Sequence, residues 1–266
     1  MAKLDYNTWS GVAYGNGIYV ACGPSIAYSH DGLNWTQKDI GMTRITKIVY
    51  GNGIFVGYGA IYNNGHDDQY IIHSTDGINW TKKLYTVSQS SISSIQFINN
   101  MFVVYFGSLN MGMSTNGIDW TIKQVNSEFR GTDIAYGNGI YVYTNYSGFY
   151  GYSTDLINWT GGIKNTSYTF RGQAAFDGEK FVAASAGGNI YTTTDGLNWT
   201  KVGYSTGRIE WITYHDGIYV VVGLNNQDSY GFMAYSTDLV NWTKFTNVQD
   251  ELGNRAGGLK YVIFVN

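Results

Sequence analysis

The chain of 266 residues has little cysteine, proline or charge: one Cys, one Pro and 13% charged residues. With Cys22 as the single thiol, no disulfide can form within the chain, so the fold does not require an oxidising compartment. The low charge and scarce proline argue against disorder. No stretch approaches the roughly 20 apolar residues of a membrane-spanning helix, and the net charge of −3 provides no basic field for nucleic acid. Cys22 lies in an apolar stretch, which predicts a buried, inert thiol.

The first residues, Met1–Tyr6, lack the apolar run of a secretory signal. We therefore expect a protein without membrane insertion, located in a phage virion, in the bacterial cytoplasm, or outside the cell by a non-classical route. No cofactor motif appears, because the chain has neither a glycine-rich phosphate loop nor a Ser-His-Asp order. We expect no cofactor and no metal, and the sequence His66-Asp67-Asp68 is interpreted as an exposed loop tip.

Aromatic residues make up 17% of the chain and glycine numbers 35, which favours β-strands joined by tight turns. One nine-residue box recurs six times. After a variable first residue it reads Ser or Thr, any residue, Asp, Gly or Leu, two residues, then Trp-Thr, and Asn116 replaces the Asp once. The copies are Tyr28–Thr36, His73–Thr81, Met113–Thr121, Tyr152–Thr160, Thr192–Thr200 and Tyr235–Thr243. Successive tryptophans lie 39 to 45 residues apart, which indicates a repeat architecture.

A second element precedes each box and has the pattern of a β-hairpin: a strand, a turn such as Asn16-Gly17, and another strand. The copies are Val12–Val20, Ile48–Val56, Ile95–Val103, Ile134–Val142, Ala175–Val182, which is one residue shorter, and Ile212–Val220. A third strand leads into each box and a fourth begins at its Trp-Thr. Four antiparallel strands per ~40 residues are typical of a β-propeller blade.

The sequence therefore predicts an all-β fold, a six-bladed β-propeller of four-stranded antiparallel blades, as one domain over residues 1–266. The predicted blades span residues 8–40, 44–86, 91–126, 130–165, 170–205 and 208–248. Residues 255–265 match the start of a blade and then stop. We expect them to form a closing strand, because an open sheet edge would be sticky. The alternative is a seventh, short blade made with residues 2–7.

The boxes resemble the Asp-box, or BNR repeat, of sialidase-like propellers, Ser-x-Asp-x-Gly-x-x-Trp. They depart from it because Asp31 and Trp35 are four residues apart, one fewer than in that motif, and because Leu156 and Leu239 replace the Gly in two copies. The repeats are also similar to those of uncharacterised bacterial and phage tail propellers. This resemblance covers nearly the whole chain and implies the fold, not an activity.

We expect each box to have a structural role. Its carboxylate and hydroxyl can accept backbone N–H groups of their own turn. Its Trp can wedge between sheets and bury up to ~250 Å². The alternative is a calcium or sugar site at each box. The residues with the predicted structural role are Asp31, Trp35, Asp76, Trp80, Asn116, Trp120, Asp155, Trp159, Asp195, Trp199, Asp238 and Trp242.

All five arginines lie at one position of the repeat, just before the first strand of a blade, whereas the eleven lysines are read as scattered. The arginines are Arg44, Arg130, Arg171, Arg208 and Arg255. Because chain direction reverses with each strand, they share a face with the two longest insertions, Ala60–Gln69 and Leu224–Tyr230, opposite the Gly/Asn hairpins and the boxes. If the first strand is innermost, this face is the mouth of the central channel.

Two interpretations of the arginines remain open. Guanidinium groups capture carboxylate or phosphate in a bidentate way, which would make the mouth an anion site with Trp9 and Trp211 available to stack on a sugar. Alternatively, each arginine pairs with a carboxylate, such as Asp133 or Glu210, or with strand-end carbonyls, and closes the seam between blades. The candidate ligand-binding residues are Arg44, Arg130, Arg171, Arg208, Arg255, Trp9, Trp211, Glu210 and Asp133.

The leading functional prediction is a non-catalytic, lectin-like module that recognises a surface glycan or other anionic polymer, as in phage-tail receptor binding or bacterial adhesion. Other virion or surface proteins are possible partners. The first alternative is a sialidase-like glycoside hydrolase, for which Glu210 is the best acidic candidate and Asp133 a possible second carboxylate. The second alternative is a propeller that serves as a protein-docking scaffold. The partner is inferred from fold analogy and the arginine positions.

Overall fold

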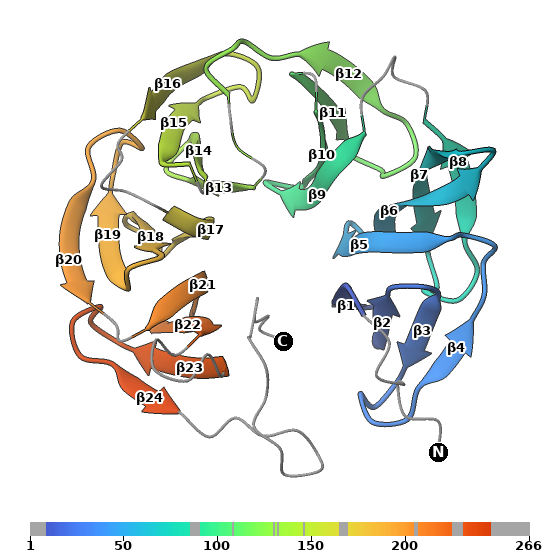
Figure 1. The fold of residues 1–266 in the computed structure, drawn as a ribbon, viewed down its shortest axis with the longest axis horizontal. Coiled ribbons are helices and arrows are strands. Elements are labelled where there is room, and N and C mark those ends of the chain that lie inside the picture. The colour runs from blue at the N-terminus through green and yellow to red at the C-terminus, as the bar shows by residue number, and fades with distance from the viewer. Residues whose placement is uncertain are drawn as a thin grey trace. The chain divides into compact units, whose positions relative to one another are not determined.

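The computed structural model of the chain describes residues 9–85, 91–107, 109–129, 131, 133–145, 147–164, 170–204, 207–224 and 231–245. The chain divides into two compact units, Met1–Gln124 and Val125–Asn266. Each unit contains three four-stranded antiparallel sheets whose strands neighbour one another in chain order (Figure 1). Within the described ranges, no helix has the length and apolar character needed to cross a membrane.

The first unit holds sheets 1 to 3. Sheet 1 comprises β1 (Gly11–Gly15), β2 (Ile18–Cys22), β3 (Ile26–Ser29) and β4 (Thr36–Lys38). Sheet 2 comprises β5 (Arg44–Gly51), β6 (Ile54–Asn63), β7 (His66–Ser74) and β8 (Thr81–Leu84). Sheet 3 comprises β9 (Ile92–Ile98), β10 (Met101–Phe106), β11 (Asn110–Ser114) and β12 (Thr121–Gln124).

The second unit holds sheets 4 to 6. Sheet 4 comprises β13 (Ile134–Gly137), β14 (Ile140–Thr144), β15 (Phe149–Ser153) and β16 (Trp159–Lys164). Sheet 5 comprises β17 (Phe170–Phe176), β18 (Phe181–Ser185), β19 (Asn189–Thr193) and β20 (Thr200–Tyr204). Sheet 6 comprises β21 (Arg208–His215), β22 (Ile218–Leu224), β23 (Gly231–Ser236) and β24 (Thr243–Phe245). The closing strand predicted for residues 255–265 lies outside the described residues.

The first hairpin of each sheet turns through residues that tolerate positive φ. Asn16 has φ 49° and Gly17 has φ 74°, as an Asn-Gly turn between two strands requires. In sheet 5, Phe176 pairs with Phe181 just as Tyr136 pairs with Tyr141 in sheet 4. The expectation that the fifth hairpin is one residue shorter is therefore wrong. That copy begins at Ala174 and has the full length.

Neighbouring sheets pack through an aromatic ring set on a glycine. A Cβ added to Gly15, the last residue of β1, would lie 2.3 Å from the ring of Tyr50 in sheet 2, and Gly51 faces Phe97 of sheet 3 in the same way. In the second unit, Gly137 faces the ring of Phe176, again at 2.3 Å. No side chain larger than hydrogen fits beneath these rings, which explains why the turn begins with glycine.

A hydrogen-bonded contact, here named the hairpin latch, accompanies this packing. Nδ2 of Asn16 donates to the carbonyl oxygens of Gly53 (3.2 Å) and Thr75 (3.0 Å), both in sheet 2. The equivalent bonds run from Asn52 to the carbonyls of Asn100 and Thr115, and from Asn138 to the carbonyl of Glu179. Because Thr75 belongs to a box and Gly53 to a hairpin, boxes and hairpins lie at the same end of neighbouring sheets, as strand parity predicted.

The insertion Ala60–Gln69 is a continuation of β6 and β7, not an irregular loop. Four further cross-strand pairs form, from Ala60 with Gln69 to Asn63 with His66. The turn is Asn64-Gly65, with φ 48° and 91°. Of the second insertion, Leu224–Tyr230, only Leu224 is described, as the last residue of β22.

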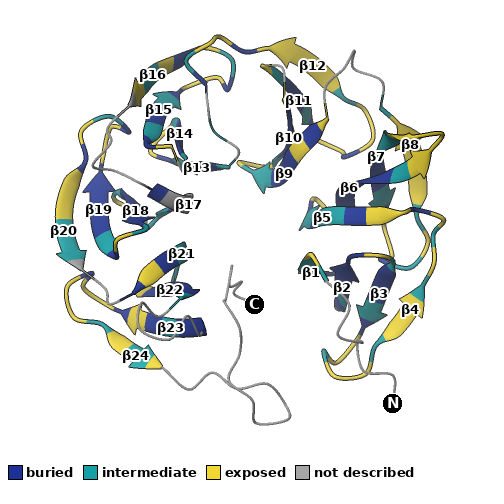
Figure 2. Ribbon diagram, viewed as in Figure 1, coloured by how far each residue is buried: buried dark blue, intermediate teal, exposed yellow. Residues whose placement is uncertain are grey.

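The second strand of each sheet is largely buried, and the fourth strand is the least buried (Figure 2). All residues of the fourth strands β8 and β12 are exposed. In the second strand β22, the first residue is exposed and the other six are buried or half-buried.

Seven of the eleven lysines lie on the fourth strands of the six sheets, so the expectation of scattered lysines is wrong. They are Lys38, Lys82, Lys83, Lys123, Lys164, Lys201 and Lys244. Lysines on an edge strand oppose pairing with another chain, which explains their position.

Removing the donor of one latch tests its contribution. We expect Asn52→Asp to lower the free energy of unfolding by about 1–3 kcal/mol, because a carboxylate cannot donate and would face two carbonyl oxygens. The matched control is Asn64→Asp, since both residues begin an Asn-Gly turn at φ 48°. Urea unfolding of the two variants gives the comparison, and equal stabilities would show that the latch does not contribute.

Candidate functional site

Each box folds around the carboxylate at its centre. In the first box, Oδ1 of Asp31 accepts the N–H groups of Leu33 (2.8 Å) and Asn34 (2.7 Å) and the hydroxyl of Ser29 (2.9 Å). Oδ2 accepts Nδ2 of Asn34 at 2.7 Å. The indole Nε1 of Trp35 donates to the carbonyl of Gly32 at 3.0 Å. The box is thus a self-contained turn in which the carboxylate, the hydroxyl and the indole all have partners.

The Asn that precedes each Trp, which the sequence analysis does not single out, is part of this turn. Its amide holds the second carboxylate oxygen in four further boxes, at 2.7–2.8 Å. These pairs are Asp76 with Asn79, Asp155 with Asn158, Asp195 with Asn198, and Asp238 with Asn241. The sequence pattern could have identified this residue, because the position before the Trp holds an Asn or an Asp in all six copies of the box.

The third box contains the same pair in reverse order. Asn116 replaces the Asp, and Asp119 replaces the Asn. Oδ1 of Asn116 accepts the N–H groups of Ile118 (3.0 Å) and Asp119 (2.9 Å), and its Nδ2 donates to Oδ2 of Asp119 at 2.9 Å. One carboxylate and one amide are therefore kept in each box, and their order can be exchanged.

The tryptophan of a box packs toward the preceding sheet. Trp80 lies against a buried cluster built from sheets 1 and 2, and Trp120 against one built from sheets 2 and 3. In the second unit, Trp199 belongs to the cluster between sheets 4 and 5, and Trp242 lies against the one between sheets 5 and 6. These four indoles occupy the wedge position expected from the sequence.

Hydrogen bonding within the box lowers the pKa of its carboxylate. Burial tends to raise the pKa of Asp155 and Asp195, but bonds from the backbone and side chain of Asn158 and Asn198 outweigh it and hold both pKa values at about 2. The backbone N–H of the Asn is the main cause of the lowered pKa of Asp31. The carboxylates are thus held in their ionised form.

The arginine positions are described in two places, one in each unit. The Arg44 guanidinium lies 2.7 Å from Oδ2 of Asp67 on β7 of its own sheet. Nε of Arg208 lies 2.5 Å from Oε1 of Glu210 on the same strand. Both arginines remain about half exposed, at 53% and 44% of their side chains. For these two residues the structure shows the pairing within a blade that the sequence left open.

Other candidate ligand residues are described only in part. Arg130 and Arg255 lie outside the described residues, and for Arg171 only its place in β17 is described. Trp9 and Trp211 are half-buried, as is Asp133. The predicted convergence of the arginines about one axis therefore stays a prediction.

The tip of the β6–β7 hairpin carries an exposed aromatic ring among polar side chains that contact one another. Tyr62 is 62% exposed. Beside it, Nε2 of His66 lies 3.0 Å from Oδ1 of Asp68, and Nδ2 of Asn63 donates to Oδ2 of Asp68 at 3.3 Å. Among the residues that the structure describes, no group of three or more His, Cys, Asp or Glu side chains is arranged to hold a metal ion. The sequence His66-Asp67-Asp68 belongs to this strand and its ion pairs.

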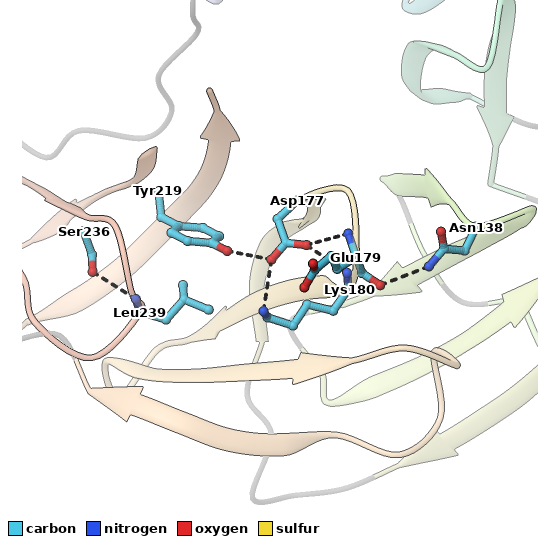
Figure 3. Close-up of polar contacts among 7 residues, drawn as sticks. All are labelled: Asn138, Asp177, Glu179, Lys180, Tyr219, Ser236 and Leu239. Atoms are coloured by element: carbon cyan, nitrogen blue, oxygen red, sulfur yellow. Dashed lines mark hydrogen bonds and ion pairs between the residues drawn. The ribbon is translucent and has the colours of Figure 1, made fainter. Parts of the chain in front are cut away.

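A buried carboxylate that sequence reasoning missed joins sheets 5 and 6 (Figure 3). Oδ1 of Asp177 accepts the N–H groups of Glu179 (2.9 Å) and Lys180 (2.8 Å), and Oδ2 accepts the hydroxyl of Tyr219 on β22 at 2.6 Å. The Lys180 ammonium lies 3.5 Å from Oδ2, and 4% of the Asp177 side chain is exposed. Burial and the bond to Asp177 raise the pKa of Tyr219. Asp177 thus links two sheets where Gly178 occupies the position of the latch Asn.

The reversed third box provides a test of the carboxylate–amide pair. We expect Asn116→Asp to destabilise the chain at pH 7, by about 1–3 kcal/mol, because it sets two carboxylates at 2.9 Å. Adding Asp119→Asn recreates the order of the other five boxes and should restore most of the loss. Urea unfolding of both singles and the double measures this coupling. A double variant that is no more stable than Asn116→Asp would contradict it.

Acid should weaken the fold through the boxes. A carboxyl of folded pKa about 2, such as Asp155 or Asp195, contributes stability that is complete above its unfolded pKa of about 3.9. This stability is lost as the pH falls from about 4 to 2, because the unfolded chain then binds more protons. We expect Asp195→Asn to be less stable than the parent at pH 7 and to lose less stability over that interval. Urea unfolding between pH 7 and pH 2 measures both slopes, and parallel slopes would contradict the expectation.

Comparison with known proteins shows the fold. No protein-family model and no curated protein matches the chain. YCF48 from Cyanidioschyzon merolae is similar with a TM-score of 0.66 and 13% identity over 94% of this chain and 86% of its own. YCF48 bound to D1 peptide gives 0.66 and 14% over 92% and 86%. The computationally designed Ika8 protein gives 0.64 and 13% over 97% and 78%, and BamB from Moraxella catarrhalis 0.55 and 10% over 92% and 76%. The chain is an all-β, six-bladed β-propeller with four-stranded antiparallel blades.

Proposed function

We propose that this propeller is a non-enzymatic docking scaffold that binds a protein segment at the β6–β7 hairpin of its first unit. The observation that carries the proposal is the form of this hairpin. It extends by four cross-strand pairs, Ala60–Asn63 with His66–Gln69, and ends in the exposed ring of Tyr62. Tyr is enriched at the energetic centres of protein interfaces, where its ring supplies apolar contact and its hydroxyl a hydrogen bond.

The charges around Tyr62 suit a protein partner better than a polyanion. Asp67 neutralises Arg44 and contacts it at 2.7 Å, so this guanidinium does not offer an uncompensated charge to a phosphate or carboxylate. On the same strand, Nε2 of His66 lies 3.0 Å from Oδ1 of Asp68. Paired charges at the rim of an aromatic contact favour the correct partner and the correct register more than they add affinity.

The comparisons support this proposal by analogy of fold. YCF48 has been solved with a bound D1 peptide, so one propeller of similar architecture holds a peptide. At 14% identity this likeness concerns the fold, and a partner for the present chain must be argued from its own residues. The residues from which it is argued are those of the β6–β7 hairpin, where Tyr62 is exposed and Asp67 contacts Arg44.

The glycan and hydrolase hypotheses remain predictions. For the glycan hypothesis, Arg208 is 44% exposed but is engaged by Glu210 at 2.5 Å. For a sialidase-like hydrolase, the same ion pair holds Glu210, and a second carboxylate would have to face it across a bound sugar. The docking proposal is preferred because it uses the groups as the structure pairs them.

A displayed library of random peptides tests the docking proposal. We expect selected peptides to bind the full chain and to lose at least about tenfold in affinity on Tyr62→Ala, a loss that corresponds to about 1.4 kcal/mol. The matched control is Tyr235→Ala, which removes another partly exposed Tyr, 39% exposed, from the second unit. Binding that is equally insensitive to both substitutions would contradict the hairpin site. A glycan-array signal that disappears on Arg208→Ala would favour the glycan hypothesis instead.

A further inference from the structure

Five asparagines of the chain are followed directly by glycine, and all five belong to the described residues. They are Asn16, Asn52, Asn64, Asn116 and Asn138. Asparagine is one of the thermolabile residues of proteins, and a glycine after it leaves the next backbone nitrogen unhindered by a Cβ. All five asparagines are exposed to solvent. A difference in their reactivity in the folded chain must therefore come from how the structure holds each amide.

The hairpin latch holds the amide in three of these sequences, those of Asn16, Asn52 and Asn138. Nδ2 of each donates to one or two carbonyl oxygens of the next sheet, at 2.9–3.2 Å. The Asn16 amide is held at both ends, because its Oδ1 also accepts the hydroxyl of Tyr50 at 2.5 Å. Phe97, which has no hydroxyl, lies at the Tyr50 position next to Asn52. These amides can turn toward the following backbone nitrogen only after their hydrogen bonds break.

The third box holds both the amide and the nitrogen that follows it. Nδ2 of Asn116 donates to Asp119 at 2.9 Å, and its Oδ1 accepts two backbone N–H groups. The N–H of Gly117 donates to the hydroxyl of Ser114 at 2.9 Å. A Cβ added to Gly117 would lie 2.4 Å from the side chain of Val56, so this nitrogen is also closely packed.

Asn64, at the tip of the β6–β7 hairpin, is held differently. It begins the same two-residue turn as Asn16, with φ 48° against 49°, between the paired residues Asn63 and His66. Among the residues that the structure describes, Nδ2 of Asn64 has no hydrogen-bond partner. The amide beside it is the one in use, since Nδ2 of Asn63 donates to Oδ2 of Asp68 at 3.3 Å. The ends of hairpins open locally at low cost in free energy, so the Asn64 side chain can reorient.

We propose that Asn64 is a site of spontaneous deamidation, and that the latch and the box protect the other four asparagines. The backbone nitrogen of Gly65 gives its proton to a solvent base and forms a bond to Cγ of Asn64. The bond between Cγ and Nδ2 breaks, and ammonia leaves with a proton returned by solvent, which yields a cyclic succinimide. One water molecule then opens the ring to aspartate or isoaspartate. The net change is the gain of one water and the loss of one ammonia, with no oxidation or reduction.

The products change the hairpin at which docking is proposed, and this consequence rests on the proposed function. Aspartate at position 64 adds a negative charge close to Asp67 and Asp68. Isoaspartate lengthens the backbone of a two-residue turn by one methylene, and the register of a hairpin depends on the length of its loop. The cross-strand pair of Tyr62 and Asp67 would then shift. We therefore expect ageing of the protein to weaken peptide binding at this hairpin.

Peptide mapping by mass spectrometry measures all five rates in one sample of the full chain, incubated in mildly alkaline buffer. The same chain unfolded in urea gives the rate that each sequence has without structure. We expect folding to slow the reaction less than about threefold at Asn64 and more than about tenfold at the other four asparagines. Equal protection of Asn64 and Asn52, which share φ 48°, would overturn the proposal.

Tyr50→Phe tests whether the hydrogen bonds of the amide cause the protection. The variant keeps the ring that lies on Gly15 and removes the hydroxyl that Asn16 accepts. Deamidation of Asn16 should become at least about threefold faster, with the rate at Asn64 unchanged. An unchanged rate at Asn16 would show that these bonds do not protect it.

Asn64→Gly separates the modification from its consequence for docking. This variant cannot deamidate at position 64, and glycine tolerates the positive φ of the turn. Incubated parent protein should lose affinity for the selected peptides, whereas incubated Asn64→Gly should keep it. Equal losses in both would contradict the consequence for docking. If no peptide binds either protein, the docking proposal fails, and the five measured rates still decide whether Asn64 is the site of deamidation.

Discussion

The architecture depends on a contact that no sheet makes alone: the side chain at the tip of one hairpin holding the backbone of the next sheet. Nδ2 of Asn16 reaches two carbonyls of sheet 2, and the ring of Tyr50 lies on Gly15 beside it. Such a repeat cannot bury its apolar face without a neighbour, so stability accumulates from one sheet to the next. The latch also fixes how neighbouring sheets are placed, because the amide donor at the tip of one hairpin must lie beside particular carbonyl oxygens of the following sheet.

The boxes have a different role: each one stabilises its own turn through hydrogen bonds between its own residues. Oδ1 of Asp31 accepts two backbone N–H groups of its own turn, and the indole N–H of Trp35 donates to a carbonyl of the same turn. The reversal at Asn116 and Asp119 shows that the requirement is one acceptor and one amide in complementary positions.

The two ends of the strands carry different kinds of contact. The end with hairpins and boxes is regular, and its polar groups are used between and within sheets. At the other end, the β6–β7 hairpin extends to the exposed ring of Tyr62, and Arg44 and Arg208 form ion pairs within their own sheets. The docking proposed for this chain rests on one such local departure from the repeat, the β6–β7 hairpin.

The sequence by itself determined the number of repeats, the strand order and the turns, because these follow from short patterns such as Asn16-Gly17 and the box around Asp31 that act within a few residues. Only the tertiary structure decided which groups meet across strands and sheets. In the structure, Arg44 contacts Asp67, residues 60–69 form paired strands where an insertion was expected, and the hydroxyl of Tyr219 donates to Asp177. These contacts connect positions 23 and 42 residues apart in the first and last of these pairs, so no local pattern specifies them. They arise when packing fixes the strand register and brings one charge or hydroxyl beside another.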